Sequence, residues 1–333
     1  MLHNPHILAF IRLHFGPYRE IIPLAGDASV RHYFRVTGSD GTAVLCIDSH
    51  FTGGDPETYP FFVVHRLLSG AGLPVPRVFG CDPRQGLIFL EDGGDDHVQT
   101  VFPRLESEAR VSLFRTLIGL MTEIQRIPPG EADVPFGLAF DVEKLMFEFS
   151  FFADHFLGDH LGIVLSQKDR TALDRAFREI CAILDQPILF VLNHRDFHSR
   201  NILLPASGPM LIDFQDARMG LPQYDAVSLL RDAYLVLNDT DVETLKTVHF
   251  ELLKGSGYDR MSRDAYDFYF DIQAFQRNVK ALGTFGYQIA VCGNRVYAPY
   301  IRPTAAYLPA VIRRRSELRA AGDILLPLLE SVL

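Results

Sequence analysis

Hydrophobic and polar positions divide the chain into a region of short segments and a longer region with helical periodicity. Apolar residues recur at helical spacing over 4–15 and stop at Gly16, which predicts a short N-terminal helix. The following residues form short apolar or alternating runs bounded by glycine, proline and aspartate, as strands do. Strands are predicted near 20–25, 30–37, 42–48, 76–81 and 86–91, with a helix near 57–70.

The pattern changes after residue 91. The segment E-D-G-G-D-D combines glycine with charge and predicts a hinge at about 90–96, between a small lobe (1–92) and a larger lobe (93–333). Helices are predicted in the larger lobe at 104–127, 141–157, 168–184, 224–237, 242–255 and 263–287. The predicted fold class is therefore α+β, with a small antiparallel sheet and one main helix in the first lobe and mainly helices in the second.

A polar motif, H-R-D-F-H-S-R-N at 194–201, interrupts the larger lobe. Apolar runs on both sides of it predict buried strands at 188–192 and 201–204, and a further short strand at 210–214 carries Asp213. In phosphoryl transfer from ATP, the pattern H-x-D-x-x-x-x-N supplies an aspartate for the acceptor hydroxyl, and the asparagine and a later aspartate hold Mg²⁺. We therefore predict Asp196 as the catalytic base and Asn201 and Asp213 as Mg²⁺ ligands. Each residue alone would be better explained as a turn residue that caps neighbouring amides, but their joint spacing favours a kinase.

The turn between the first two predicted strands, G-D-A-S-V-R at 26–31, suits contact with a phosphate group. Glycine permits a tight turn, small side chains let backbone N–H groups approach an anion, and serine adds a hydroxyl donor. A plain hairpin turn has a similar composition. Combined with the motif at 194–201, the turn predicts four ATP-binding residues, Gly26, Asp27, Ala28 and Ser29.

The strand predicted at 42–48 lacks the lysine that contacts ATP phosphates in protein kinases, and Lys144 is the first lysine of the chain. On the preceding strand, the period of two places Arg31 and Arg35 on one face. We expect one of them to bind the phosphates, although a solvated arginine face fits the pattern equally well. Glu57, near the predicted helix start, would orient that arginine or only favour the helix dipole.

Composition restricts the classes of function. The 333 residues are 48% hydrophobic, enough for a large core, and the formal net charge is −9 with no block of Lys and Arg. Nucleic acids and acidic membranes are therefore disfavoured as partners, and no obligate protein partner is indicated. The four cysteines are scattered, and no apolar run approaches the ~20 residues that span a bilayer. We expect a cytoplasmic protein with reduced thiols.

Three motifs carry a family resemblance: G-D-A-S-V-R-H-Y-F-R at 26–35, H-R-D-F-H-S-R-N at 194–201 and Q-R-N-V-K-A-L-G-T-F at 276–285. With them, nearly the whole chain resembles the aminoglycoside phosphotransferase and choline kinase superfamily, which has a protein-kinase-like fold. Within it, the chain is most similar to the bacterial anomeric kinases that phosphorylate N-acetylmuramate and N-acetylglucosamine in cell-wall recycling. The resemblance implies a kinase that depends on ATP and Mg²⁺.

The resemblance also implies roles for individual residues. The backbone around Glu91 would bind adenine, the turn at 26–29 would cover the phosphates, and Asp225 would brace the catalytic loop. The subgroup commonly lacks the strand lysine, so its absence here does not imply an inactive protein. One departure is Gly93, which replaces a bulky residue of the family pattern and predicts a looser hinge.

The acceptor is less constrained than the ATP site. The helices predicted at 141–157 and 263–287 supply polar residues that would read sugar hydroxyls or only form a solvated face: Glu148, Asp154, Gln276, Arg277 and Asn278. We predict acceptor contacts by Glu148, His198 and Asp216. The preferred acceptor is the anomeric hydroxyl of an amino sugar; the alternatives are an aminoglycoside, choline, homoserine or another small alcohol, and a nucleotide-binding pseudokinase.

Overall fold

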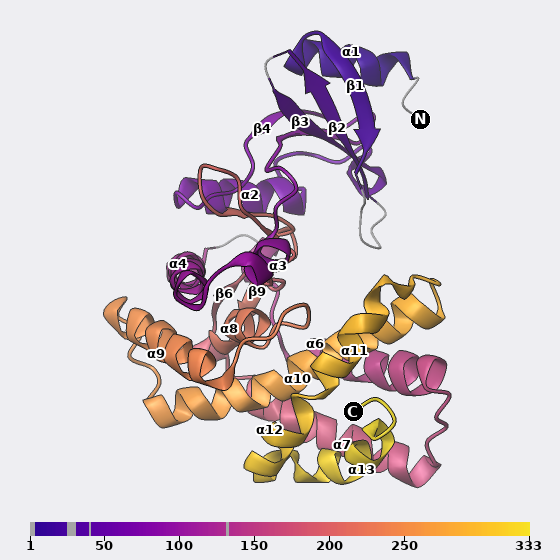
Figure 1. The fold of residues 1–333 in the computed structure, drawn as a ribbon, viewed down its shortest axis with the longest axis vertical. Helices are drawn as coiled ribbons and strands as arrows, with labels where there is room; N and C mark the ends of the chain where they lie inside the picture. Colours follow the sequence, from indigo (N-terminus) through magenta and orange to yellow (C-terminus); the bar gives the residue numbers. More distant parts are fainter. Residues whose placement is uncertain (1–3, 25–30, 40, 131–132) are drawn as a thin grey trace. The chain divides into compact units, whose positions relative to one another are not determined.

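The computed structural model describes residues 4–24, 31–39, 41–130 and 133–333, which divide into two compact units (Figure 1). The N-terminal unit comprises Met1–Val98 and Ile202–Gln215, and the helical unit comprises Gln99–Asn201 and Asp216–Leu333. The segment 202–215 thus belongs to the N-terminal unit although it follows half of the helical unit in sequence. The sequence, which predicts a boundary after residue 92, gives no signal for this return.

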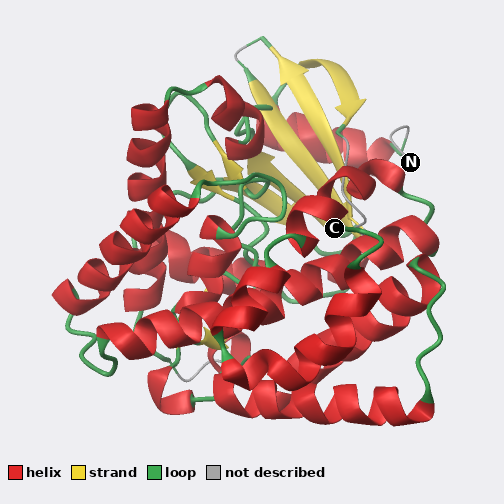
Figure 2. Cartoon of the chain, turned by 60° about the horizontal axis from the view of Figure 1, so that its bottom comes forward, coloured by secondary structure: helices red, strands yellow, loops and turns green. Residues whose placement is uncertain are grey.

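The N-terminal unit is built on an antiparallel sheet of five strands in the order β1-β2-β3-β5-β4 (Figure 2). Its elements are α1 (Pro5–Phe15), β1 (Tyr18–Pro23), β2 (Arg31–Gly38), β3 (Thr42–Asp48), η1 (Ser49–Phe51), α2 (Pro60–Gly70), β4 (Val78–Asp82) and β5 (Leu87–Glu91). The predicted strands are confirmed within a few residues. The helix α2 begins three residues later than predicted, with Pro60 in its first turn, where the missing N–H costs nothing.

Two small cores lie on opposite faces of this sheet because successive strand side chains alternate in direction. On one face Val36, Leu45 and Phe89 pack with Ile7 and Ile11 of α1. On the other face the core contains Cys46, Phe51, Phe62, Ile88 and Leu90, with Tyr33 packed against it. Arg31 and Arg35 share this second face with Tyr33 through the period of two in β2.

A short hairpin completes the N-terminal unit. Its strands are β7 (Ile202–Leu203) and β8 (Met210–Leu211), which pair antiparallel with Ile202 opposite Leu211. Gly93 lies against this hairpin, and a Cβ atom at Gly93 would stand 2.5 Å from Cδ1 of Leu203 and 2.9 Å from Sδ of Met210. The residue that departs from the family pattern is therefore closely packed.

The helical unit surrounds a two-stranded sheet formed by β6 (Val191–Asn193) and β9 (Arg218–Gly220). Its longer helices are α4 (Ser107–Arg126), α6 (Val142–Phe151), α7 (Gln167–Leu184), α8 (Gln223–Leu230), α9 (Asp239–Gly255), α10 (Arg263–Ala290), α11 (Ala298–Ala305) and α13 (Arg319–Leu329). Short elements connect them: α3 (Val98–Val101), η2 (Phe102–Arg104), α5 (Asp133–Phe136), η3 (Phe152–His160), η4 (Pro187–Leu189), η5 (Arg295–Tyr297), α12 (Leu308–Arg314) and η6 (Ser316–Leu318). None of the helices in the described ranges has the length and hydrophobicity needed to cross a membrane.

The helix α10 is the centre of the helical unit and is buried along most of its length. Two glycines let the π-helical segment η3 approach it: a Cβ atom at Gly283 would lie 2.8 Å from Cα of Phe152, and one at Gly286 would lie 2.7 Å from Cα of Phe156. Several buried residues of α10 are polar, including Gln276, Arg277 and Asn278. Burial of such groups is costly without partners, which marks this part of α10 as a candidate site.

Four predicted elements of the larger lobe, two helices and two strands, are wrong in extent. The helix expected at 224–237 ends at Leu230, because Arg231 leaves the helical conformation at φ −121° and ψ 43°. The helix expected at 141–157 changes to a π-helix at Phe152. The strand expected at 188–192 is Val191–Asn193 in the structure, because a 3₁₀ turn occupies Pro187–Leu189. The strand expected at 210–214 has only two residues, Met210–Leu211.

Candidate active site

The loop 194–201 follows β6 and is held by two buried carboxylates. Asp225 of α8 accepts the backbone N–H of His194 at 2.6 Å and that of Arg195 at 3.0 Å. Asp232, in the turn after α8, accepts the backbone N–H of Ser199 at 2.8 Å. Burial raises the pKa of Asp225 to about 7 and that of Asp232 to about 6, while these N–H groups oppose the shift. The two carboxylates thereby fix both ends of the loop, and the expected bracing by Asp225 is confirmed.

Backbone strain is concentrated next to the predicted catalytic residues. Among the described residues, the non-glycine residues with positive φ are Arg195, at 81°, and Asp213, at 65°. Arg195 directly precedes Asp196, and Asp213 is itself a predicted metal ligand. A left-handed backbone costs a non-glycine residue free energy and persists where the surrounding structure holds it, commonly at functional sites.

The Asp196 carboxylate lies among three cations in the helical unit. Lys280 donates from Nζ to Oδ1 at 3.1 Å, Arg277 has a guanidinium nitrogen 3.6 Å from the same oxygen, and Arg195 has one 3.7 Å from Oδ2. Burial alone would raise the pKa of the Asp196 carboxyl, but these three cations together hold it well below its usual range. Asp196 is therefore ionised at neutral pH and able to accept a proton from a hydroxyl group.

The predicted metal ligands lie in different units. Asn201 is in the helical unit with Asp196, and its Nδ2 donates to the backbone oxygen of Asp196 at 3.0 Å. Asp213 is in the N-terminal unit, two residues after the end of β8, and its Oδ1 accepts from Nε2 of Gln215 at 2.8 Å. An amide oxygen and a carboxylate are hard oxygen donors, so the chemistry of both residues suits Mg²⁺.

The turn that carries Asp213 is anchored by its neighbour Phe214, which is 1% exposed. The Phe214 ring stacks on Phe61 of α2 with ring centres 5.3 Å apart, and His65 lies one helical turn further along. The tight packing of Phe214 fixes the backbone at Asp213, which helps to explain how a positive φ is maintained there.

The three predicted acceptor residues differ in their surroundings. His198 packs against Tyr234 and has a buried Nδ1 without a hydrogen-bond partner in the described structure. Burial lowers the pKa of His198 to about 3, so its ring is neutral at pH 7. Asp216 is exposed and accepts from Arg195 at 2.6 Å. Glu148 of α6 is 4% exposed and accepts from Nε2 of Gln276 at 2.8 Å.

Both arginines of β2 have carboxylate partners within the N-terminal unit. Arg31 donates from Nε to Asp48 at 2.7 Å, and Arg35 donates to Asp92 at 2.6 and 3.0 Å and to Asp95 at 2.9 Å. Contact of either arginine with ATP stays a prediction. Glu57 is not their partner: it lies before α2, is exposed, and pairs with Arg66 at 3.5 Å.

Of the remaining predicted ATP-binding residues, Glu91 is among the described residues and the four of the turn at 26–29 are not. Gly26, Asp27, Ala28 and Ser29 lie outside the described residues. Glu91 ends β5, where its backbone N–H donates to the backbone oxygen of Arg77 at 2.9 Å and its carboxylate pairs with the Arg77 side chain at 3.2 Å.

Sequence reasoning missed Lys280, Arg195 and Asp232. The spacing of Arg277 and Lys280 carried a usable signal, since residues three apart lie on the same face of a helix. Arg195 could not be singled out, because the sequence does not distinguish an ordinary loop arginine from one with a positive φ beside a buried carboxylate. Asp232 was not singled out because the predicted helix at 224–237 ran through it, whereas Asp232 lies in the turn after α8, which ends at Leu230.

Comparison with known proteins defines the family. The model of a phosphotransferase enzyme family matches residues 20–262. The N-acetylmuramate/N-acetylglucosamine kinase of Neisseria meningitidis is 32% identical over 91% of this chain and 89% of that protein. The enzyme of the same name from Pseudomonas aeruginosa is 31% identical over 93% of this chain and 88% of that protein.

Solved structures share the fold at low sequence identity. A choline kinase from Streptococcus pneumoniae matches with a TM-score of 0.60 and 13% identity over 93% of this chain and all of that chain. The ADP-bound aminoglycoside phosphotransferase APH(2″)-Ib matches with a TM-score of 0.60 and 12% identity over 92% of this chain and 99% of that chain. The expected protein-kinase-like fold, with an antiparallel sheet followed by a helical region, is confirmed. The chain belongs to the phosphotransferase enzyme family, whose kinases use ATP, and is a small-molecule kinase.

Proposed function

We propose that the protein transfers the γ-phosphate of ATP, with Mg²⁺, to the anomeric hydroxyl of N-acetylmuramate or N-acetylglucosamine in the cytoplasm. The observation that carries this proposal is the ionised Asp196 in a loop whose two ends are fixed by Asp225 and Asp232. The two relatives above, named for these sugars and about one-third identical over most of their length, support the acceptor.

The proposed chemistry uses Asp196 to accept the acceptor proton. Lys280 occupies Oδ1, whereas Oδ2 accepts no hydrogen bond from the described residues and is the oxygen that would receive the sugar hydroxyl. The depressed pKa of Asp196 makes it a weak base, which suits a loose transition state in which the hydroxyl is oriented first and loses its proton late. The fixed loop backbone keeps the hydroxyl in line with the phosphate.

Mg²⁺ would be held by the side-chain oxygens of Asn201 and Asp213 and would neutralise charge on the ATP phosphates. The amide nitrogen of Asn201 donates to the backbone oxygen of Asp196, which supports the amide oxygen as the Mg²⁺ ligand. Gly26, Asp27, Ala28 and Ser29 would cover the phosphates, and backbone groups near Glu91 would bind adenine. Arg31 and Arg35 would reach ATP only by sharing or exchanging their present carboxylate partners.

His198, Asp216 and Glu148 would contact the sugar. The neutral His198 offers an unsatisfied ring nitrogen to a hydroxyl group, and the two carboxylates offer acceptors. A polycationic aminoglycoside fits less well as an acceptor, because Lys280, Arg277 and Arg195 already surround Asp196 with positive charge. A pseudokinase would have no need of an ionised base fixed in this way.

ADP release measured with a panel of acceptors tests the proposal: N-acetylmuramate, N-acetylglucosamine, an aminoglycoside, choline and homoserine. We expect turnover with the amino sugars, and we expect Asp196→Asn to lower kcat by at least about 100-fold, as for loss of a catalytic base. Asp174→Asn, on α7, is the matched control and should retain activity, because the Asp174 side chain is 40% exposed and pairs with Arg170. Turnover with only a different acceptor would refute the sugar assignment, and ATP binding without turnover on any acceptor would refute the kinase.

A further inference from the structure

Two cations of α10, Arg277 and Lys280, share a single carboxylate. Both approach Oδ1 of Asp196, at 3.6 Å and 3.1 Å, and they lie on one helix face because they are three residues apart. Their side chains are only 10% and 15% exposed. Burying a second cation beside one carboxylate is costly, so stability alone gives no reason to keep both.

The neighbouring acidic groups have other partners. Asp216 pairs with Arg195 at 2.6 Å, and Glu148 lies 3.8 Å from Lys144 and accepts from Gln276. The carboxylates of Asp225 and Asp232 are directed at backbone N–H groups of the catalytic loop. The pair formed by Arg277 and Lys280 therefore has more positive charge than Asp196 alone balances.

The pair also has hydrogen-bond donors to spare. A lysine ammonium has three donors and a guanidinium has five. In the described structure Lys280 uses one of them, toward Asp196, and Arg277 uses Nε, toward Oγ of Ser228 at 3.1 Å. Unused donors on two adjacent buried cations are the features of a site that binds an anion.

We propose that Arg277 and Lys280 form the carboxylate-binding subsite for the sugar acceptor, so that the enzyme prefers an acidic amino sugar to its neutral counterpart. This inference rests on the proposed sugar kinase function. N-acetylmuramate carries an ether-linked lactate with a carboxylate, whereas N-acetylglucosamine has a hydroxyl at that position and leaves the subsite unfilled. The same two cations repel amino groups, which excludes polycationic acceptors from this side of Asp196.

N-acetylmuramate has the lactate carboxylate and N-acetylglucosamine lacks it, so a comparison of the two sugars isolates the contribution of the carboxylate. If the cations only keep Asp196 ionised or contact the transferred phosphate, removal of one affects both sugars equally. If they bind the lactate, removal affects N-acetylmuramate alone. The quantity to measure is therefore the ratio of the kcat/KM values for the two sugars, in which effects on ATP and on Asp196 cancel.

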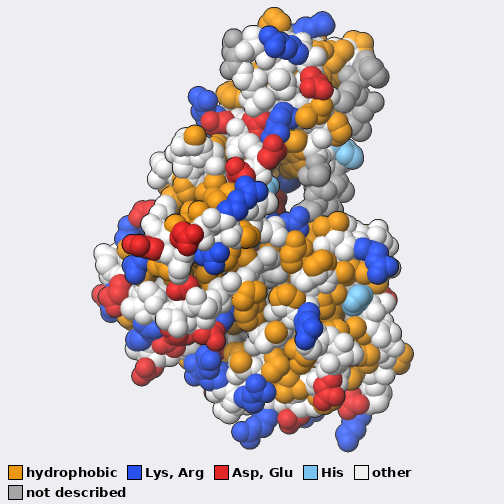
Figure 3. Space-filling model, in the orientation of Figure 1, with side chains coloured by type: hydrophobic (Ala, Val, Ile, Leu, Met, Phe, Trp, Pro, Cys, Tyr) orange, Lys and Arg blue, Asp and Glu red, His pale blue; other side chains and the backbone are white. Residues whose placement is uncertain are grey.

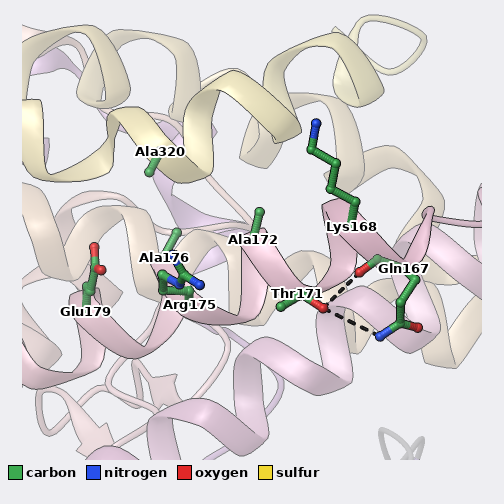
Figure 4. A pocket seen from close by; sticks show the side chains of 8 residues that line it. All are labelled: Gln167, Lys168, Thr171, Ala172, Arg175, Ala176, Glu179 and Ala320. Carbon is green, nitrogen blue, oxygen red and sulfur yellow. Dashed lines mark hydrogen bonds between the residues drawn. The ribbon is translucent and has the colours of Figure 1, made fainter.

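We expect Lys280→Gln to lower kcat/KM for N-acetylmuramate roughly 10- to 100-fold more than for N-acetylglucosamine, mainly through KM, as for loss of a hydrogen bond to a charged group. Lys280→Arg, which keeps the charge, should restore much of the preference. Arg277→Gln is a second variant with the same expected direction. Lys168→Gln, in an open groove between α7 and α13, is a control for loss of a lysine charge and should not change the ratio (Figure 4).

Binding of the two sugars to the wild-type protein without ATP, measured by calorimetry, separates the subsite from the catalytic proposal. Tighter binding of N-acetylmuramate that is lost in Lys280→Gln supports the subsite, even if neither sugar is phosphorylated. Absence of phosphorylation of both sugars would refute the proposed function and not the subsite. Equal binding of both sugars by the wild-type protein, or an equal loss for both sugars in the folded variants, overturns the subsite.

Discussion

The Asp225 carboxylate accepts the backbone N–H of His194 at 2.6 Å, two residues before the proposed base Asp196. It also accepts the N–H of Arg195, whose backbone has a φ of 81°. One buried side chain thus holds the strained part of the catalytic loop. The position of Asp196 depends on a residue that need not contact either substrate.

Asp225→Ala should lower the free energy of unfolding by about 2–3 kcal/mol, because it leaves two buried N–H donors without an acceptor. It should also lower kcat more than it raises either KM, since the base is displaced while the binding surfaces remain. Asp225→Asn keeps one acceptor oxygen and should have a smaller effect. Urea unfolding and steady-state kinetics measure both quantities.

The control for this prediction is Asp259→Asn, which removes an exposed carboxylate that pairs with Lys254. Its effect on stability should stay within about 0.5 kcal/mol, as for other surface substitutions. A full kcat in a folded Asp225→Ala protein would show that the loop does not need this anchor.

The preference for N-acetylmuramate should depend on pH through Lys280. Burial, and then the charge of Arg277, lower the pKa of Lys280 to about 8, while Asp196 and Glu148 oppose the shift. Lys280 is therefore charged at pH 7 and loses its charge as the pH rises through about 8. The ratio of kcat/KM for N-acetylmuramate to that for N-acetylglucosamine should fall across this pH range, because kcat/KM reports the free enzyme.

The same ratio in Lys280→Arg provides the comparison, since arginine stays charged throughout this range. The variant should show a flat profile between pH 7 and 9, about one unit on each side of the Lys280 pKa. A wild-type ratio that does not change with pH would argue against a titrating lysine at the subsite.

Gly286→Ala should destabilise the protein by about 1–3 kcal/mol or more, since an added methyl group overpacks a closed contact. Its Cβ atom would stand 2.7 Å from the backbone oxygen of His155 and from Cα of Phe156, and backbone atoms cannot rotate away. The comparison is Gly119→Ala on α4, where nothing lies within 4 Å and alanine should stabilise the helix by about 0.5–1 kcal/mol. Thermal unfolding of the two variants should therefore shift in opposite directions.

The sequence predicted the N-terminal sheet well because its strands have strong periodicity and are separated by glycine, proline and charged turns. The return of 202–215 to the N-terminal unit was not predictable, since β7 and β8 have only two residues each and carry no periodic pattern. The apolar run at 233–237 suggested a longer α8, but these residues are in non-helical turns after Arg231. Local pattern cannot distinguish a buried turn from a buried helix of this length.

The candidate site, like the fold, was predictable from the sequence only in part. Asp196 was predictable from motif spacing, because the chemistry demands particular oxygen atoms at fixed positions in a loop. Two of the three cations around Asp196, Arg277 and Lys280, come from α10, more than 80 residues later in the chain, and their proximity is a result of tertiary packing. On the face of the helical unit that Figure 3 shows, acidic and basic side chains are interspersed. The formal net charge of the chain therefore gave no indication of the buried cations around Asp196.

The central claim is that Asp196 directs the γ-phosphate of ATP to the anomeric hydroxyl of an amino sugar. Phosphorus-31 NMR of the reaction mixture tests it most directly, because a phosphate on the anomeric oxygen couples to the anomeric proton of the sugar. We predict a single sugar phosphate with that coupling from the wild-type protein and none from Asp196→Asn in the same time. A phosphate on another hydroxyl, or release of inorganic phosphate alone, would contradict the account.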